Sequence, residues 1–181
     1  TPVYYTYPSQ EETVNDRVNE VISSLITDGM TDTEKITAIY DYVYEHVSYD
    51  RVHKNNRYYH LKTTAYAALV NGCAVCQGYS VLMYRLLREA GVSARVVTGT
   101  ANSASGSEYH AWNIVRIDGV YYNVDVTWDS MTGTHGYFLK GEESFSADHI
   151  RDAEYSTDSF RSLYPVSEKD YMETHDAVIL N

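Results

Sequence analysis

Three side chains of the sequence have the types needed for nucleophilic acyl chemistry: Cys76, His110 and Asp125. A cysteine attacks a carbonyl as its thiolate, a histidine moves the proton, and a carboxylate orients the histidine ring. Cys76 directly precedes an apolar helical stripe, and the positive end of a helix favours a thiolate. The backbone N–H groups around Cys76 and Gln77 are natural donors to an oxyanion. We therefore predict that Cys76 is a thiol nucleophile at the start of a buried helix.

A predicted β-hairpin brings His110 and Asp125 together. Asp118-Gly119 is a strong two-residue turn signal between two segments rich in β-branched and aromatic residues. With this turn, opposed residues have numbers that sum to 237, which sets His110 opposite Thr127 and Trp112 opposite Asp125. His110 and Asp125 are then diagonal neighbours on one face, roughly 7–8 Å apart at the backbone. A carboxylate can reach an imidazole nitrogen across that distance.

The remaining patterns predict an α+β fold of N-terminal helices followed by an antiparallel sheet. Capping-box spacing at Ser9–Glu12 and at Thr31–Glu34 predicts two amphipathic helices, and Gly29 is expected to end the first. We expect one domain, with a helical part at about 9–91, a sheet part at about 92–140 and a C-terminal extension at 141–181. Gly136 to Leu139 is a candidate for one more short strand, and the basic stretch Arg51 to His60 is expected to be a loop.

The composition excludes several classes of partner. A net charge of -11 argues against nucleic acid and against anionic membrane surfaces, which attract clustered Lys and Arg. No run approaches the ~20 apolar residues of a membrane span. An acidic, lysine-poor chain with 19 tyrosines is typical of an extracytoplasmic bacterial protein, secreted or on the cell surface. Tyrosine suits a substrate groove, and it also half-buries on ordinary helices and strands.

Three segments resemble the transglutaminase-like superfamily, which includes transglutaminases, bacterial cysteine-peptidase-like relatives and peptide N-glycanases. They are Cys76-Gln77-Gly78-Tyr79-Ser80, His110-Ala111-Trp112-Asn113 and Val124-Asp125-Val126-Thr127-Trp128-Asp129, in the family's order. The resemblance covers about Glu34 to Glu142. It implies a papain-like core in which the nucleophile helix packs on an antiparallel sheet. It also implies that Cys76 is the nucleophile, His110 the general base and acid, and Asp125 the orienting carboxylate.

The sequence departs from the family pattern in two respects. Cys73 falls outside the match, and no tryptophan upstream of Cys76 corresponds to the oxyanion donor of animal transglutaminases. Trp112 and Trp128 are therefore support candidates, which either wall the site or fill the core. Cys73 is interpreted as a buried small residue, with a regulatory disulfide to Cys76 as the alternative.

Other chemistries remain open for the two cysteines. Cys73 and Cys76 have the spacing of a zinc half-site, which would need His53 and His60 as further ligands, or of a redox pair. A non-catalytic or regulatory binding module on the same scaffold is the third alternative. Our preferred prediction is hydrolysis, or less favoured transglutaminase-type transfer, of peptide amides through a thioester on Cys76. The substrate is a peptide or protein, with cell-wall peptide as one candidate, and the reaction calls for no metal or organic cofactor.

Overall fold

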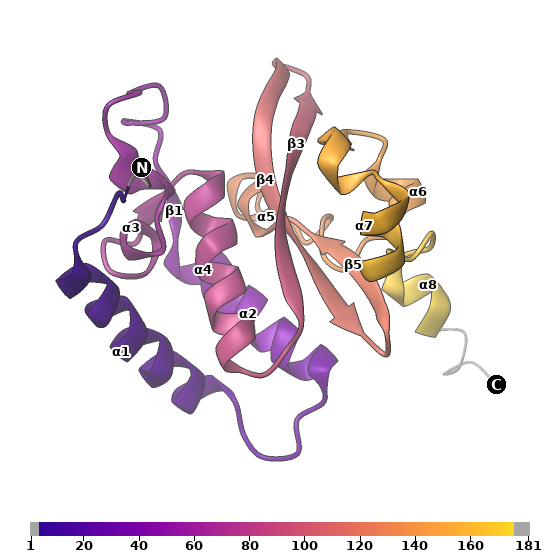
Figure 1. The fold of residues 1–181 in the computed structure, drawn as a ribbon, viewed down its shortest axis with the longest axis horizontal. Helices are drawn as coiled ribbons and strands as arrows, with labels where there is room; N and C mark the ends of the chain where they lie inside the picture. Colours follow the sequence, from indigo (N-terminus) through magenta and orange to yellow (C-terminus); the bar gives the residue numbers. More distant parts are fainter. Residues whose placement is uncertain (1–3, 176–181) are drawn as a thin grey trace.

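The computed structural model describes residues 4–175 and shows the N-terminal helices on one side of a central antiparallel sheet and the short C-terminal helices on the other (Figure 1). The helices are α1 Pro8–Leu25, α2 Asp32–His46, α3 Ala65–Leu69, α4 Cys76–Glu89, α5 Val126–Thr132, α6 Glu142–Phe145, α7 Asp158–Leu163 and α8 Tyr171–His175, with 3-10 turns η1 His60–Thr63 and η2 Ala153–Tyr155. The strands are β1 Ser48–Tyr49, β2 Cys73–Ala74, β3 Ala94–Ser103, β4 Gly106–Ile117, β5 Val120–Val124 and β6 His149–Arg151. The predicted α+β class is confirmed.

The capping signals located the second helix better than the first. Thr31 caps α2 as predicted, because its Oγ1 accepts the Glu34 N–H and a Glu34 carboxylate oxygen accepts the Thr31 N–H at 2.8 Å. Helix α1 instead begins at Pro8, and the Gln10 side chain accepts the Tyr7 N–H at 2.9 Å. The prediction that Gly29 ends this helix was wrong, because α1 ends at Leu25 and Gly29 lies in the following turn.

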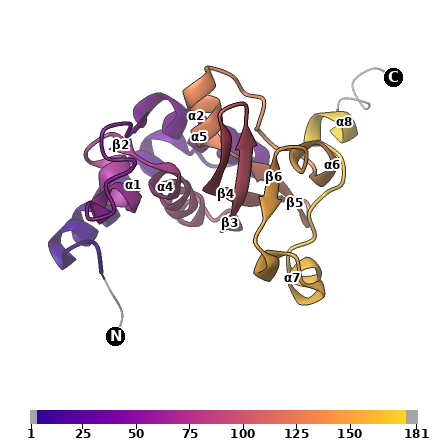
Figure 2. The same cartoon turned by 90° about the horizontal axis from the view of Figure 1, so that it is seen from above.

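The sheet has the strand order β5-β4-β3-β6 and separates two hydrophobic cores. Helices α1, α2 and α4 and one face of the sheet enclose the larger core, whose centre is formed by Ile36, Ile39, Tyr40, Leu82, Met83 and Val115. The smaller core lies where the C-terminal segment covers the sheet, and it contains Val97, Trp112, Ile114, Tyr121, Phe145 and Phe160 (Figures 1 and 2). The segment from residue 141 onward is thus more than an appended tail, since it supplies strand β6 and, in Phe145 and Phe160, two residues of the second core. Residues 176–181 of the expected extension lie outside the described residues.

Strand β5 is shorter than the sequence pattern predicted. The register of β4 and β5 is the predicted one, with Ile117 opposite Val120 and Asn113 opposite Val124. Pairing stops there, because Asp125 leaves the strand and caps helix α5. The expected pairs of His110 with Thr127 and of Trp112 with Asp125 are therefore absent from the ladder. The extra strand expected from Gly136 to Leu139 is also absent, and only a bridge between Asn123 and Lys140 forms there.

The residues after Cys76 attach helix α4 to its surroundings on three sides. A Cβ on Gly78 would lie 2.6 Å from the Ala74 Cβ and 2.9 Å from the Lys62 carbonyl oxygen, so only glycine fits without displacement. The Tyr79 hydroxyl donates to the Val47 carbonyl at 2.6 Å, and the Ser80 hydroxyl donates to the Ala111 carbonyl at 2.9 Å. These contacts fix the start of α4 against β2, the end of α2 and the strand that carries His110.

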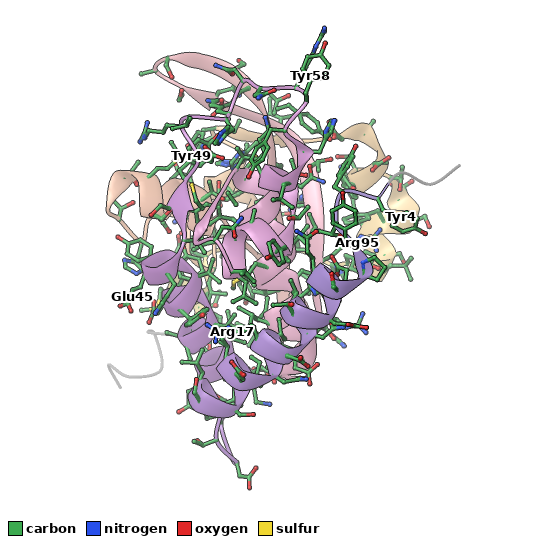
Figure 3. The ribbon with its side chains drawn as sticks, turned by 90° about the vertical axis from the view of Figure 1, so that its left-hand side faces the viewer. Tyr4, Arg17, Glu45, Tyr49, Tyr58 and Arg95 are labelled. Atoms are coloured by element: carbon green, nitrogen blue, oxygen red, sulfur yellow. The ribbon has the colours of Figure 1, made fainter. Side chains whose placement is uncertain are left out.

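Two segments at the top of Figure 1 flank the start of α4: the loop at 50–59 and the β3–β4 hairpin. The loop forms a series of turns, as the lack of a clean hydrophobic period predicted, and Tyr58 projects from its tip (Figure 3). An ion pair of 2.6 Å joins Lys54 in the loop to Glu108 in the hairpin. Across residues 4–175, every helix falls short of the length and apolarity that a membrane crossing requires.

We predict that Gly78→Ala lowers the free energy of unfolding by about 1–3 kcal/mol, because the added methyl group overpacks α4 against β2 and the Lys62 carbonyl. The displaced helix start should also reduce the reactivity of Cys76. Gly136→Ala is the matched control, since its Cβ would meet only Thr134 and Asp129 side-chain atoms at 3.8 and 3.9 Å. Urea unfolding of both variants measures the difference. Equal stabilities would show that the close approach at Gly78 does not constrain the helix.

Candidate active site

Cys76 is the first residue of helix α4 and is half-buried. Val75, at the N-cap, provides no side-chain hydrogen bond to the first turn. The N–H groups at the start of a helix have no intrahelical partners, so those of Cys76 and Gln77 are available as hydrogen-bond donors next to the thiol. The sequence-predicted position of Cys76 at a helix N-terminus is therefore present in the structure.

His110 lies between Cys76 and Asp125. Its Nε2 and the Asp125 Oδ2 are 2.6 Å apart, and both side chains are almost fully buried. The same imidazole lies close enough to Cys76 for the thiol to contribute to the raised pKa of His110. Because Nε2 is engaged by the carboxylate, Nδ1 is the ring nitrogen left to serve the thiol. The structure thus brings the three residues singled out in the sequence together, with a hydrogen bond between His110 and Asp125.

Asp125 is held by the helix that begins after it. Its Oδ1 accepts the backbone N–H groups of Thr127 and Trp128 at 3.0 and 3.2 Å, which is the usual role of aspartate as a helix N-cap. Its other oxygen is thereby directed toward His110. The predicted hairpin named the correct partner of His110, but Asp125 is the N-cap of α5 and not, as predicted, a residue of the neighbouring strand.

Burial and charge oppose one another at this pair. Burial favours the neutral form of His110, but the charge of Asp125 and the hydrogen bonds to Asp125 and Cys76 outweigh it and raise the pKa of His110 to about 10. Burial alone would raise the pKa of Asp125, yet the charge of His110 and hydrogen bonds from two histidines hold that pKa well below its usual range. The pair is therefore an imidazolium and a carboxylate at neutral pH.

The second histidine on Asp125 is His149, which the sequence analysis missed. Its Nε2 lies 3.1 Å from the Asp125 Oδ2, and its Nδ1 lies 2.6 Å from the Asp148 Oδ1. The side chain is fully buried. His149 comes from β6, a strand of three residues that pairs with β3. So short a strand has no hydrophobic period of its own, so the sequence carried no pattern that could have assigned it.

The predicted support residues occupy different positions. Trp112 is fully buried, and its Nε1 donates to the Asn123 Oδ1 at 3.2 Å, so it fills the second core and is not free to act as an oxyanion donor. Trp128 is half-buried and packs beside His110, with ring centroids 5.7 Å apart, so it walls the site. Gln77 is exposed next to Cys76 and offers its backbone N–H.

The structure does not assemble the proposed zinc site at the cysteines. Both cysteines are free thiols, and His53 is engaged by Asp50 at 3.0 Å while His60 stacks on Tyr5. Cys73 is half-buried in β2, and burial together with the charge of Asp50 raises the pKa of its thiol. The surroundings of Cys73 therefore disfavour its thiolate, and the alternative of a disulfide between the two cysteines is not formed.

A different set of metal donors exists at the triad itself. In the described part of the chain, His110, Asp125 and His149 bring two nitrogens and one oxygen within 4.8 Å of one another. A zinc ion bonded to nitrogen and oxygen at about 2.0–2.2 Å would hold tetrahedral ligands roughly 3.3 Å or more apart. The Nε2–Oδ2 separations of 2.6 and 3.1 Å are instead those of hydrogen bonds. The cluster fits shared protons better than a metal ion.

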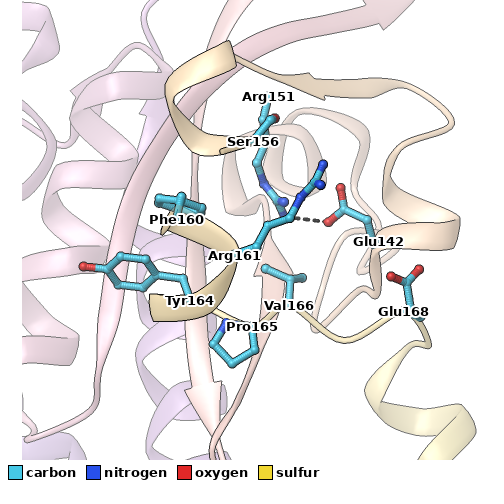
Figure 4. Close-up of a pocket in the computed structure, with 9 residues that line it drawn as sticks. All are labelled: Glu142, Arg151, Ser156, Phe160, Arg161, Tyr164, Pro165, Val166 and Glu168. Carbon is cyan, nitrogen blue, oxygen red and sulfur yellow. Dashed lines mark ion pairs between the residues drawn. The ribbon is translucent and has the colours of Figure 1, made fainter. Parts of the chain in front are cut away.

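Two polar pockets differ in their relation to Cys76. A pocket of about 520 Å³ is lined by the C-terminal segment, and there Arg151 pairs with Glu142 at 2.7 Å (Figure 4). None of the three triad residues lines it. A second pocket, of about 360 Å³, is lined by Tyr49 and Tyr79 among others. Burial raises the pKa of Tyr49, and the charge of a Cys76 thiolate adds to the rise, so one residue of this pocket lies within electrostatic reach of Cys76, although no triad residue lines the pocket.

The raised pKa of His110 predicts a pH-dependent stability, which is best measured in Cys76→Ala so that no thiol titrates at the site. The His110 proton is bound more tightly in the folded chain than in the unfolded chain, where its pKa is ~6.5. Its contribution should be fully present below ~6.5 and lost as pH rises toward about 10. In Cys76→Ala the pKa of His110 in the folded chain should lie somewhat below 10, because Cys76 contributes to raising that pKa. The measurement is the difference between the free energies of unfolding of Cys76→Ala and of Cys76→Ala/His110→Gln. This difference should fall with pH by at most ~1.4 kcal/mol per pH unit. A difference that does not change with pH would contradict the buried imidazolium.

Comparison with known proteins agrees with this geometry. The sequence profile described as "Transglutaminase-like superfamily" matches residues 19–126. The kyphoscoliosis peptidases of Mus musculus and Homo sapiens are 30% identical over alignments of 165 and 167 positions, which cover 80% and 81% of this chain. The chain spans about a quarter of the length of these relatives, 24% and 25%.

A solved structure titled "Crystal structure of a TGase" superposes with a TM-score of 0.58 at 22% identity, covering 91% of this chain and 40% of that one. The fold is thus the papain-like α+β core that the sequence predicted, and the chain belongs to the transglutaminase-like superfamily.

Proposed function

We propose that this chain is a thiol enzyme that cleaves amide bonds through a thioester on Cys76. The observation that carries the proposal is the placement of His110, which is hydrogen-bonded to a buried Asp125 and lies close enough to Cys76 for the thiol to raise its pKa. An imidazolium beside a cysteine at a helix N-terminus favours the thiolate, which is the nucleophilic form.

The reaction has two halves. The Cys76 thiolate attacks the carbonyl carbon, and the N–H groups of Cys76 and Gln77 stabilise the resulting oxyanion. His110 gives its Nδ1 proton to the amide nitrogen, the C–N bond breaks, and the amine leaves while a thioester remains. Neutral His110 then takes a proton from water, whose oxygen attacks the thioester. The C–S bond breaks, the acid is released, and the thiolate–imidazolium pair is restored.

A peptide or protein amide is the substrate class that we propose. The curated relatives carry the name peptidase, and the polar pocket lined by Tyr49 and Tyr79 has room for a side chain or a short peptide segment. Hydrolysis is favoured over transfer to an amine because water is always present, whereas nothing in the sequence marks a dedicated amine site. An extracytoplasmic location stays a prediction from composition, and cell-wall peptide stays one candidate substrate.

We expect Cys76→Ser to abolish cleavage of peptide amides while the far-UV circular dichroism stays unchanged, because an alcohol is a far weaker nucleophile at neutral pH. Cys73→Ser is the matched control and should change the rate by less than about twofold. Release of new amino and carboxyl termini measures hydrolysis, and incorporation of a fluorescent primary amine measures transfer. If Cys73→Ser is as inactive as Cys76→Ser, the nucleophile has been assigned to the wrong cysteine.

Alkylation by iodoacetamide from pH 5 to 9 tests the nucleophile without any knowledge of the substrate. Cys76 should be labelled rapidly at pH 6, where an ordinary thiol of pKa ~8.5 is only about 0.3% ionised. Cys73 should be labelled slowly, and His110→Ala should remove the fast reaction of Cys76. Mass spectrometry reads each cysteine separately. Slow labelling of both thiols, with ordinary pH profiles, would favour the non-catalytic binding module instead.

Asp125→Ala should lower both activity and stability. Loss of the orienting carboxylate is expected to reduce the rate by about 10²–10⁴-fold, because His110 is left in the wrong tautomer or orientation. It also leaves two buried histidines without their common partner and uncaps α5, at a cost of about 3–5 kcal/mol. Asp125→Asn keeps an acceptor in place and should cost less stability for a similar loss of rate. Equal rates for Asp125→Asn and the unaltered protein would contradict the role of the charge.

A further inference from the structure

The ring of His149 lies between two carboxylates. Both of its ring nitrogens face carboxylate oxygens, Nε2 toward Asp125 at 3.1 Å and Nδ1 toward Asp148 at 2.6 Å. An ionised carboxylate only accepts hydrogen bonds, so each ring nitrogen must carry a proton for both bonds to form. An imidazole with two protonated nitrogens is an imidazolium. A buried cation is retained only where it is paired in this way.

The contacts of this imidazolium reach the triad directly. The Oδ2 of Asp125 accepts both the His110 Nε2 at 2.6 Å and the His149 Nε2 at 3.1 Å, so one carboxylate oxygen serves two imidazoles. The two ring centroids are 5.6 Å apart. With His149 charged, two cations share the negative charge of Asp125. Without that charge, Asp125 would act on His110 alone.

The rest of the surroundings shields His149 from water and strengthens its interactions. Phe145 stacks on the ring with centroids 4.1 Å apart, and Trp128 meets it edge-on at 4.6 Å. Within residues 4–175, the titratable groups that face it from the elements packed against the ring are Asp125, Asp148, His110 and Tyr137. The Tyr137 hydroxyl donates to the Asp148 Oδ2 at 2.7 Å and so holds that carboxylate in place.

We propose that His149 is a positioning residue of the triad, an imidazolium that shares Asp125 with His110 and keeps the Cys76–His110 pair reactive at a lower pH than Asp125 alone would allow. The inference rests on the proposed function and adds a fourth side chain to it. The physical reason is that a nearby positive charge stabilises the thiolate and eases loss of the His110 proton. His110 must lose that proton in each catalytic cycle and regain it.

His149→Gln separates the charge from the hydrogen bond. A glutamine amide nitrogen can occupy the place of Nε2 and still donate to Asp125, but it carries no charge. Loss of the cation should raise the pKa values of both members of the Cys76–His110 pair. Both limbs of the pH profile for Cys76 alkylation should therefore move to higher pH by about one unit. His46→Gln, which changes an exposed histidine on α2, is the matched control and should leave the profile in place.

Nitrogen-15 NMR of the histidine rings tests the charge in the unaltered protein, so the proposal does not depend on whether the variant folds. The His149 signals, identified by their absence in another variant, His149→Phe, or by their contacts to Phe145, should show both ring nitrogens protonated at pH 7. A neutral ring, with one nitrogen unprotonated, would overturn the inference.

The outcomes distinguish this inference from the proposed function. An ordinary profile for Cys76 in the unaltered protein would overturn the proposed function, and with it the role of His149. A reactive Cys76 whose profile does not move in His149→Gln would overturn only the present inference, because a hydrogen bond without charge would then be enough. An upward shift in His149→Gln, with no shift in His46→Gln, supports it.

Discussion

The site depends on one buried carboxylate that accepts four hydrogen bonds. Asp125 receives two backbone N–H groups at one oxygen and two imidazole nitrogens at the other. A buried carboxylate is costly unless it is fully paired, and here each pairing also positions a different element. The backbone bonds begin helix α5, His110 fixes strand β4, and His149 fixes strand β6. The geometry of the reacting pair and the closure of the fold are thus satisfied by the same side chain.

A second constraint fixes the nucleophile. Helix α4 approaches its neighbours so closely at Gly78 that no side chain fits, and Tyr79 and Ser80 bind the carbonyls of Val47 and Ala111. These three residues follow Cys76 directly, so any error in seating the helix would move the sulfur. The bond from Ser80 is made next to His110 in β4. The motif around Cys76 therefore has a packing role, because it sets the distance between helix α4, which carries Cys76, and strand β4, which carries His110.

The C-terminal segment completes the site from the far side of the sheet. Strand β6 approaches β3 so tightly that a Cβ on Gly99 would lie 2.1 Å from the Ile150 carbonyl oxygen. This close pairing brings His149 over Asp125, and Phe145 and Trp128 then exclude water from the ring. In a dry, aromatic surrounding, charges interact more strongly than at a surface. The second core thus supports the electrostatics of the triad as well as the stability of the sheet.

The sequence by itself determined the fold class and the start of α4, and it named the three side chains that the structure brings together at the candidate site. Local signals sufficed for these, because capping spacing, hydrophobic period and the Asp118-Gly119 turn act over a few residues, and the register of β4 and β5 followed from that turn. Only the tertiary structure decided that Asp125 caps a helix, because a short apolar segment such as VDVTW fits a strand or a buried helix equally by pattern. Only the tertiary structure revealed His149, because a strand of three residues is defined by the partner it pairs with and not by its own residues.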